Sequence, residues 1–295
     1  GATCSFTPPN AVDTTITCTD DGTYTATLTA TDVHLVSSTD TTTINVYPPS
    51  LGFAPSASGY SRGLDKLVLI STGPNALKLV DPYTAAVSSV TLPASVKAFS
   101  LSPDGKLAIV LHESVASLVD LVSMTVVKSF ATGGSHTDAF LTNSGVAYFI
   151  GQTGGQWVDR PVMYFNARTG EDLSKNQAPT GFGYFYGTQY GVLAASLNKV
   201  LVMSTGLSPS DISYFKFDPA TNAVTQSGDS PYHGDYSMMP PLFLSENEDL
   251  VFTASGNFFY TDTLRYAGTF GLQGRRLISV SNSVARDETL VLASG

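Results

Sequence analysis

Short apolar runs of similar length and composition recur from residue 67 to the end of the chain. Their sequences are LVLIST, LAIVLH, VAYFIG, VLVMST, LVFTAS and LVLASG, and they begin at residues 67, 107, 146, 200, 250 and 290. A polar turn precedes each run, as in Ser102–Lys106 and Ser245–Asp249. Turn-bounded apolar strands at a spacing near 40 residues are typical of a β-propeller, in which each repeat is one four-stranded blade. We therefore predict that each run is the second strand, b, of a blade.

The segments around each run predict the other strands of the blades. Strand a is expected at 96–102, 138–142, 192–197, 241–245 and 277–283, and strand d at 86–92, 125–130, 223–227 and 268–271. Strand c ends at Asp81, Asp120, Asn166, Asp218 or Asp262. These side chains are expected to hydrogen-bond the backbone two residues further on and to start the c–d hairpin.

The repeats give five complete blades and strands a and b of a sixth. A closed ring needs its last blade finished, and nothing near residue 50 supplies two further strands. We expect that the chain is cut at its C-terminus and that the natural protein has six or seven blades. The alternative is an arrangement of five and a half blades that a partner chain closes.

A different pattern fills the first fifty residues. Residues 21–32 (DGTYTATLTATD) alternate, with Tyr24, Ala26, Leu28 and Ala30 on one face and mainly threonine on the other. This pattern predicts a strand that is buried on one side. A second strand is expected at 41–47, and Pro48-Pro49 ends the segment. The chain therefore divides into a small β domain at 1–49 and a propeller at 50–295.

Composition narrows the classes of partner and compartment. Only 13% of residues are charged, the formal net charge is -9, and no basic cluster indicates nucleic-acid binding. No apolar stretch approaches the roughly 20 residues of a membrane span, and no signal-peptide pattern opens the chain. The two cysteines, Cys4 and Cys18, are expected to form a disulfide in an oxidising compartment. The alternative is a pair of buried free thiols.

Two segments resemble known families. DGTYTATLTATD followed by TDTTTINVYPP resembles the last two strands of a PKD-type immunoglobulin-like domain. SPDGKLAIVL with LVDLVSMTVVKSFATG resembles the YVTN-type propellers of bacterial and archaeal surface-layer and periplasmic proteins. The resemblance implies an all-β chain, with a partial immunoglobulin-like β-sandwich that lacks its early strands, ahead of the propeller. It also implies an extracellular or cell-surface location in a prokaryote.

The third and fourth repeats are longer than the others because of inserted loops at 151–160, 178–189, 205–213 and 227–240. All four are b–c or d–a loops, which share one face of a propeller, and long loops on a rigid scaffold commonly carry binding. The predicted binding residues there are Trp157, Asp159, Arg160, Tyr184, Tyr186, Tyr232, His233, Asp235 and Tyr236. Aromatic side chains suit stacking on sugar rings or anchoring a peptide. The alternative is that they pack the loops onto the blades.

Three histidines, His112, His136 and His233, map to the same face, with Glu113 and Asp138 close in sequence to the first two. Such a cluster could bind a metal or transfer protons. However, the chain has no HxH, HExxH, Walker or metal-ligand CxxC motif. We therefore predict no catalytic residue, no metal site and no cofactor, and histidines that are isolated polar loop residues.

The favoured function is a cell-surface binding or adhesion module, whose propeller face binds a glycan, a peptide or a neighbouring surface protein. One alternative is a structural surface-layer or filament subunit that assembles with copies of itself. The other is a propeller lyase or hydrolase that uses the face with His112, His136 and His233.

Overall fold

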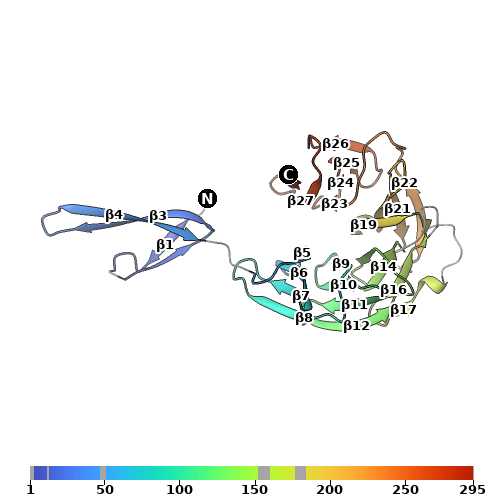
Figure 1. The fold of residues 1–295 in the computed structure, drawn as a ribbon, viewed down its shortest axis with the longest axis horizontal. Coiled ribbons are helices and arrows are strands. Elements are labelled where there is room, and N and C mark those ends of the chain that lie inside the picture. The colour runs from blue at the N-terminus through green and yellow to red at the C-terminus, as the bar shows by residue number, and fades with distance from the viewer. Residues whose placement is uncertain (1–2, 12, 47–50, 152–159, 177–183, 295) are drawn as a thin grey trace. The chain divides into compact units, whose positions relative to one another are not determined.

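A computed structural model describes residues 3–11, 13–46, 51–151, 160–176 and 184–294. Within these ranges the regular structure is β-strand, apart from two short 3-10 helices, η1 (Ser174–Asn176) and η2 (Ala195–Leu197). Contacts divide the chain into two compact units, Gly1–Ala54 and Pro55–Gly295 (Figure 1). Among the described residues, no helix has the length and hydropathy needed to cross a bilayer.

The described part of the first unit consists of two separate hairpins. Strand β1 (Cys4–Thr7) pairs with β2 (Thr15–Cys18), and a disulfide joins Cys4 to Cys18 across them, with the two Cα atoms 4.0 Å apart. Strand β3 (Gly22–Thr31) pairs along its whole length with β4 (Ser37–Val46). The prediction that one face of β3 is buried is wrong for the second half of the strand, because Leu28 is 70% exposed and Ala30 is also exposed. No sheet covers it within the described residues.

The second unit contains five four-stranded antiparallel sheets, here called blades 1 to 5. Blade 1 is β5 (Ala57–Ser61), β6 (Lys66–Thr72), β7 (Asn75–Val80) and β8 (Val87–Thr91); blade 2 is β9 (Ala98–Leu101), β10 (Leu107–Leu111), β11 (Val115–Asp120) and β12 (Thr125–Ala131). Blade 3 is β13 (Asp138–Leu141), β14 (Val146–Ile150), β16 (Met163–Asn166) and β17 (Glu171–Asp172). Blade 4 is β19 (Thr188–Ala194), β20 (Lys199–Thr205), β21 (Ile212–Phe217) and β22 (Val224–Asp229); blade 5 is β23 (Leu242–Leu244), β24 (Leu250–Thr253), β25 (Asn257–Tyr260) and β26 (Tyr266–Thr269).

Two further hairpins complete the described strands. Strand β27 (Leu277–Ser283) pairs with β28 (Glu288–Ala293) after blade 5, and β15 (Arg160–Pro161) pairs with β18 (Tyr184–Phe185) outside the sheet of blade 3. The first strands of successive blades are neighbours, from β5 and β9 through β13, β19 and β23 to β27. The blades therefore fan out from their first strands, as in a propeller (Figure 1).

The predicted repeat is confirmed at the level of strands, since the six apolar runs correspond to β6, β10, β14, β20, β24 and β28. Strand a of blade 4 was predicted at 192–197 but runs from Thr188 to Ala194, because its register pairs Thr188 with Thr205 and the chain then turns into η2. The first strand of blade 1 and the last strand of blade 3 were not predicted. Their sequences, ASGYS and ED, are too short or too polar to show a pattern.

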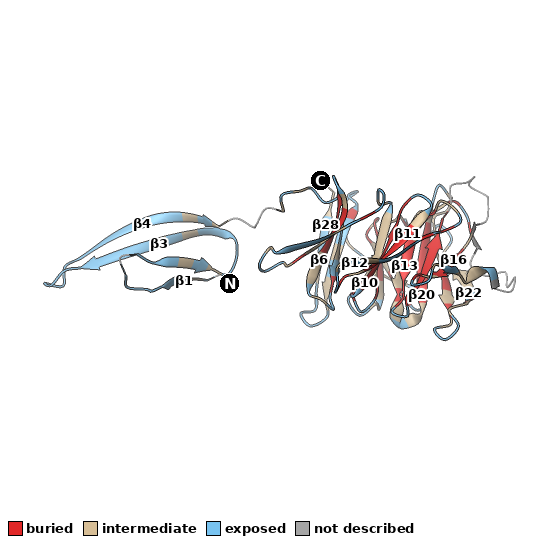
Figure 2. Cartoon of the chain, turned by 90° about the horizontal axis from the view of Figure 1, so that it is seen from below, coloured by how far each residue is buried: buried red, intermediate tan, exposed pale blue. Residues whose placement is uncertain are grey.

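The core lies between blades rather than within them. In β14 the side chains alternate, so that Phe149 packs in a cluster between blades 2 and 3, while Tyr148 packs between blades 3 and 4. Strand β10 does the same, with Ile109 on one side and Val110 on the other. A strand with apolar neighbours on both faces is apolar at every position, which explains the unbroken runs. Figure 2 shows these middle strands as the buried layer.

The c–d turns form as the acidic or amide residue at the end of strand c predicts. Backbone N–H groups two residues on donate to the carboxylate of Asp81, Asp120 and Asp218 and to the amide oxygen of Asn166. Four residues after each of these positions, the backbone is left-handed, at Ala85, Met124, Asn222 and Gly170. Blade 5 differs, because Asp262 accepts from the next residue, Thr263.

Candidate functional site

Much of the predicted binding patch lies in segments that the structure leaves undescribed. Trp157 and Asp159 lie outside the described residues. Of Arg160 and Tyr184 the backbone is described, in the small β15–β18 sheet, where Arg160 is opposite Phe185 and Tyr184 is opposite Pro161. A patch that joins these four residues therefore stays a prediction.

Two of the predicted aromatics pack against blade 5. The ring of Tyr236 stacks on that of Tyr266, with centroids 4.2 Å apart and planes at 7°, and it meets Tyr232 edge-on at 4.7 Å. Tyr232 also accepts a hydrogen bond at its hydroxyl from the Tyr266 N–H, at 3.0 Å. Both tyrosines contact the apolar cluster between blades 4 and 5, which includes Phe259. Tyr232 and Tyr236 therefore pack their loop onto blade 5, which is the alternative considered from the sequence.

The remaining predicted residues are exposed. His233 lies in the loop between β22 and β23, with its Nδ1 3.8 Å from a carboxylate oxygen of Asp211, and its backbone N–H donates to Asp235 at 2.9 Å. Burial raises the pKa of Asp211. Tyr186 follows β18 and is 41% exposed, and its carbonyl accepts from Ser204 Oγ at 2.7 Å.

The three histidines do not share one accessible surface. His112 and His136 are 1% and 0% exposed, whereas His233 is on an exposed loop. The ring nitrogens of His112 lie 2.9 Å from the Ser95 carbonyl oxygen and 3.1 Å from Ser117 Oγ. Burial lowers the pKa of His136, which favours its neutral form. His112 and His136 therefore lie in loops, as predicted, but both are buried, and the ring of His136 packs against that of Phe149 at 5.4 Å.

Proton transfer by this trio has no geometric support, because two of its rings are enclosed. Within the described ranges, no group of three His, Cys, Asp or Glu side chains is arranged to hold a metal ion.

Hydrogen bonds at the face formed by the b–c and d–a loops join blade 3 to blade 4. Asp138, at the start of β13, accepts from the Gly191 N–H of β19 at 3.0 Å, and Gln189 accepts from the Gly151 N–H at 3.0 Å. Thr137 Oγ1 donates to the Gln189 carbonyl. Gly191 has to be a glycine, because a Cβ there would collide with the Leu201 carbonyl oxygen and lie 2.9 Å from the ring of Phe140. Burial raises the pKa of Asp138 to about 6.

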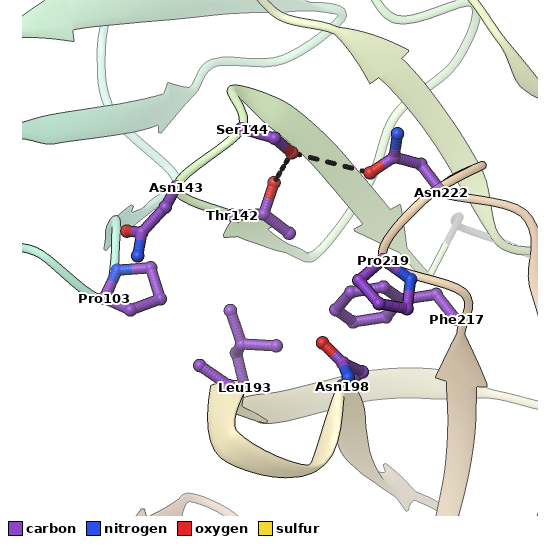
Figure 3. A pocket seen from close by; sticks show the side chains of 10 residues that line it. Pro103, Thr142, Asn143, Ser144, Leu193, Asn198, Phe217, Pro219 and Asn222 are labelled. Atoms are coloured by element: carbon purple, nitrogen blue, oxygen red, sulfur yellow. Dashed lines mark hydrogen bonds between the residues drawn. The ribbon is translucent and has the colours of Figure 1, made fainter.

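The opposite face, formed by the a–b and c–d turns, carries a pocket with a volume of about 190 Å³ (Figure 3). We call it the turn-face pocket. It is lined by Pro103, Thr142, Asn143, Ser144, Leu193, Ala195, Asn198, Phe217, Pro219 and Asn222. Most of these residues belong to the a–b turns of blades 2, 3 and 4 and to the c–d turn of blade 4, and Leu193 and Phe217 lie near the ends of β19 and β21. The pocket thus spans three consecutive blades.

Local backbone chemistry places the three asparagines of the pocket. Asn198 ends η2 and Asn222 lies in the c–d turn of blade 4, and both are left-handed, with φ of 47° and 60°. Asparagine adopts this conformation more readily than most residues. Asn143 belongs to the a–b turn of blade 3, and its Oδ1 accepts from the Asp104 N–H of blade 2 at 2.9 Å. This hydrogen bond joins the a–b turns of blades 2 and 3 at the pocket.

The walls combine amide groups with apolar surfaces. Thr142 Oγ1 lies 2.8 Å from Ser144 Oγ, which is 3.5 Å from Asn222 Oδ1. Pro103, Leu193, Phe217 and Pro219 supply apolar surface to the same lining (Figure 3). No lining residue is ionisable, so this surface can bind an uncharged group by hydrogen bonds and apolar contact but offers no side chain for acid–base catalysis.

Sequence reasoning missed this pocket because it treated every a–b and c–d turn as plain turn chemistry. Each asparagine is individually an ordinary turn residue. A signal was nevertheless present, since Asn143, Asn198 and Asn222 recur in turns that a propeller places on one face.

Comparison with known proteins supports the fold alone. No family model matches the chain, and no curated protein matches it. The chain is similar in structure to the β-propeller domain of Cps50 (Swd1) from Myceliophteria thermophila, with a TM-score of 0.57 and 13% identity over 82% of this chain and 80% of that one. It is also similar to Hsv2 from Kluyveromyces lactis, with a TM-score of 0.57 and 12% identity over 80% and 69% of the two chains.

A weaker likeness is to Kuenenia stuttgartiensis hydrazine synthase, with a TM-score of 0.48 and 12% identity over 81% of this chain and 66% of that one. At identities of 12–13%, a likeness of structure identifies an architecture and leaves the activity open. The chain is an all-β protein whose second unit has the β-propeller fold, in a five-bladed arrangement.

Proposed function

We propose that this chain is a non-catalytic binding module whose turn-face pocket anchors an uncharged segment of a partner protein. The observation that carries the proposal is a pocket built by turns of three blades, with amide side chains beside apolar ones and no ionisable group in its lining. A peptide offers the matching chemistry, because its backbone N–H and C=O pair with amide side chains while one apolar side chain contacts the apolar part of the lining.

The size of the pocket fits one anchor of this kind. Its volume of about 190 Å³ is below the roughly 300–1,000 Å³ of a site for a drug-sized ligand and suits a single apolar side chain. The rest of a partner would lie on the surrounding turns. Such an anchor contributes affinity because it removes apolar surface from water at a site that is already ordered.

We also propose, from the sequence resemblance and the Cys4–Cys18 pair, that the protein works outside the cell or at a prokaryotic cell surface. Disulfides persist mainly in such oxidising compartments. The PKD-like identity of residues 1–49, the YVTN-type identity of residues 50–295 and the placement of β27 and β28 as strands a and b of a sixth blade belong to the same proposal. A glycan ligand and the loop patch around Trp157 stay as competing predictions.

The test is an array of short peptides and neutral oligosaccharides, probed first with the natural protein. Ser144→Trp should fill the pocket and weaken binding to peptide hits at least about tenfold, since blocking a central anchor typically costs over 1 kcal/mol. The matched control is Ser123→Trp, which adds the same side chain to an exposed c–d turn of blade 2, away from the pocket. It should leave binding unchanged.

A second variant, Trp157→Ala, distinguishes which of the two faces binds the partner. If Ser144→Trp binds like the natural protein while Trp157→Ala loses binding, the partner uses the loop face and the proposal fails. If the natural protein binds only oligosaccharides on the array, the pocket remains the proposed site, but its ligand is a glycan and not a peptide.

A further inference from the structure

One wall of the turn-face pocket is a single turn of blade 4. Leu193, Ala195 and Asn198 all line the pocket, and they lie at the end of β19, in η2 and directly after η2. We call residues 193–198 the wall turn. Within the described ranges, no hydrogen bond joins residues 195–198 to blade 2 or blade 3, which supply the opposite wall. The polar contacts that fix the wall turn therefore come from blades 4 and 5.

The first contact from blade 5 is made by Glu248, in the a–b turn of that blade. The backbone N–H of Ser196, in η2, donates to Glu248 Oε2 at 2.7 Å. Ser196 does not line the pocket, whereas its neighbour Ala195 does. A hydrogen bond to an ionised acceptor is roughly twice as strong as one between neutral groups. The carboxylate therefore holds η2 to blade 5 through a residue outside the pocket lining.

The second contact is made by Lys199, which directly follows the wall turn. Its side chain is enclosed, with only 1% of the residue exposed. Its Nζ donates to the carbonyl oxygens of Thr261 at 2.8 Å and Asp262 at 3.1 Å, at the start of the c–d turn of blade 5. It also lies 4.2 Å from the centre of the Tyr214 ring, on β21. The ammonium group therefore links blades 4 and 5 next to the pocket.

This ammonium group has no carboxylate partner. None of the ion pairs among the described residues includes Lys199. Burial lowers its pKa to about 8; Lys216, opposite it on β21, lowers the pKa further, and Asp262 opposes both. A buried charge costs free energy unless its hydrogen bonds are made, and an apolar side chain would fill the same space without that cost. What the ammonium group adds is a directed link to two carbonyl groups of blade 5.

We propose that Lys199 and Glu248 are positioning residues, which hold the wall turn in the shape that binds the apolar anchor of a peptide. This role rests on the function proposed above, and it adds blade 5 to a pocket whose lining comes from blades 2, 3 and 4. Neither side chain lines the pocket, so neither touches the anchor. A change at either one should move the side of the pocket formed by Ala195 and Asn198 and leave the blade 3 side in place.

Peptide affinity tests this role. The probe is a peptide from the array that has blocked ends and no ionisable side chain. Lys199→Met keeps the length of the side chain but removes its donors, and Glu248→Ala removes the acceptor. Each should weaken binding about threefold to thirtyfold, the range typical of residues that act on a site through another element. Lys216→Met and Asp249→Ala are the matched controls, because these neighbouring side chains form no hydrogen bond with the wall turn, and both should bind like the natural protein.

The pH profile distinguishes a charged Lys199 from one that only fills space. No lining residue of the pocket is ionisable, and neither is the probe. With a pKa of about 8, the Lys199 side chain is charged at pH 7 and mostly neutral at pH 9. A neutral amine makes weaker hydrogen bonds to the two carbonyl oxygens. The affinity of the natural protein should therefore fall from pH 7 to pH 9, whereas Lys199→Met should have a flat profile.

Hydrogen exchange followed by NMR tests the same link without a ligand. In Glu248→Ala, the Ser196 N–H has lost its acceptor and should exchange about tenfold faster or more, as expected for the loss of a hydrogen bond to a charged group. In Lys199→Met, the amides of residues 195–198 should also exchange faster. If exchange in these residues is unchanged in both variants, blade 5 does not hold the wall turn and the proposed role is wrong.

The outcomes separate this role from the function on which it rests. If Ser144→Trp loses binding while Lys199→Met and Glu248→Ala bind like the natural protein, the pocket remains the site and the positioning role fails. A natural protein whose affinity is constant from pH 7 to pH 9 overturns the role of the Lys199 charge. If the natural protein binds no peptide, the proposed function fails, and hydrogen exchange still decides whether blade 5 holds the wall turn. Should Lys199→Met not fold, Glu248→Ala and the pH profile of the natural protein decide the question.

Discussion

Strand β3 of the first unit and strand β14 of blade 3 are both well-formed antiparallel strands, yet one is largely exposed and the other fully buried. In β3, apolar residues alternate with threonine, and β4 is its only partner among the described strands. In β14, all five residues are 0–5% exposed, because blades 2 and 4 cover its two faces and β13 and β16 its two edges. Hydrogen-bond pairing is therefore common to both, and burial is what separates them.

This contrast shows where stability resides in the chain. A two-stranded hairpin is marginal in water unless another layer or a cross-link supports it. The first unit has such a cross-link at Cys4 and Cys18. The propeller contains no cysteine and depends on the packing of one blade against the next.

The largest expected effect comes from opening the core beside β14. Phe149 packs edge-on against Phe165 and Phe130, with centroids 5.7 Å and 6.3 Å away. Phe149→Ala should lower the free energy of unfolding of the propeller by about 3–5 kcal/mol. Leu28→Ala in β3 is the matched truncation at an exposed position and should cost under about 0.5 kcal/mol. Denaturant melts followed by circular dichroism measure both, and equal losses would show that the two strands are alike in environment.

The next largest effect comes from removing the cross-link. Replacing Cys4 and Cys18 together by serine should destabilise the first unit by about 3 kcal/mol, because the disulfide closes a loop with a sequence separation of 14. Hydrogen exchange read by mass spectrometry should become faster in residues 3–46 and stay unchanged in the blades. Two free thiols per chain in the denatured, unreduced natural protein would show that the cross-link is absent.

A smaller effect tests the hydrogen bonds between blades 3 and 4. Burial raises the pKa of Asp138 from 3.8 to about 6 in the folded protein. The folded state then binds this proton more tightly than the unfolded state, so stability is highest below pH 4 and falls as the pH rises to 6. Asp138→Asn should remove that slope, so its stability relative to the natural protein should rise by on the order of 2 kcal/mol between pH 4 and pH 7.

Melting temperatures across this pH range measure the change. Asp218→Asn is the control, because this aspartate also accepts backbone N–H bonds but lies in a c–d turn. If the natural protein and Asp138→Asn have parallel pH profiles, Asp138 titrates like an exposed carboxylate.

Much of the fold could be predicted from sequence because strands that are apolar on both faces leave unbroken runs. The run VAYFI identified β14, and the turn residues Asp81, Asp120 and Asp218 identified the c–d hairpins. The site could not be predicted in the same way. The turn-face pocket depends on Asn143, Asn198 and Asn222, which are far apart in the sequence and meet only because their turns share one face.

The repeat, the strand order within each blade and the chemistry of the turns follow from the sequence alone, because these features depend on neighbours a few residues apart. The arrangement of the blades in space decides which of several similar strands is buried. Ile109 in β10 and Leu290 in β28 both belong to apolar runs. Ile109 is buried because blades 1 and 3 flank its sheet, whereas Leu290 is exposed because nothing described lies beside it. Burial depends on which sheets lie alongside, and a strand's own sequence does not contain that information.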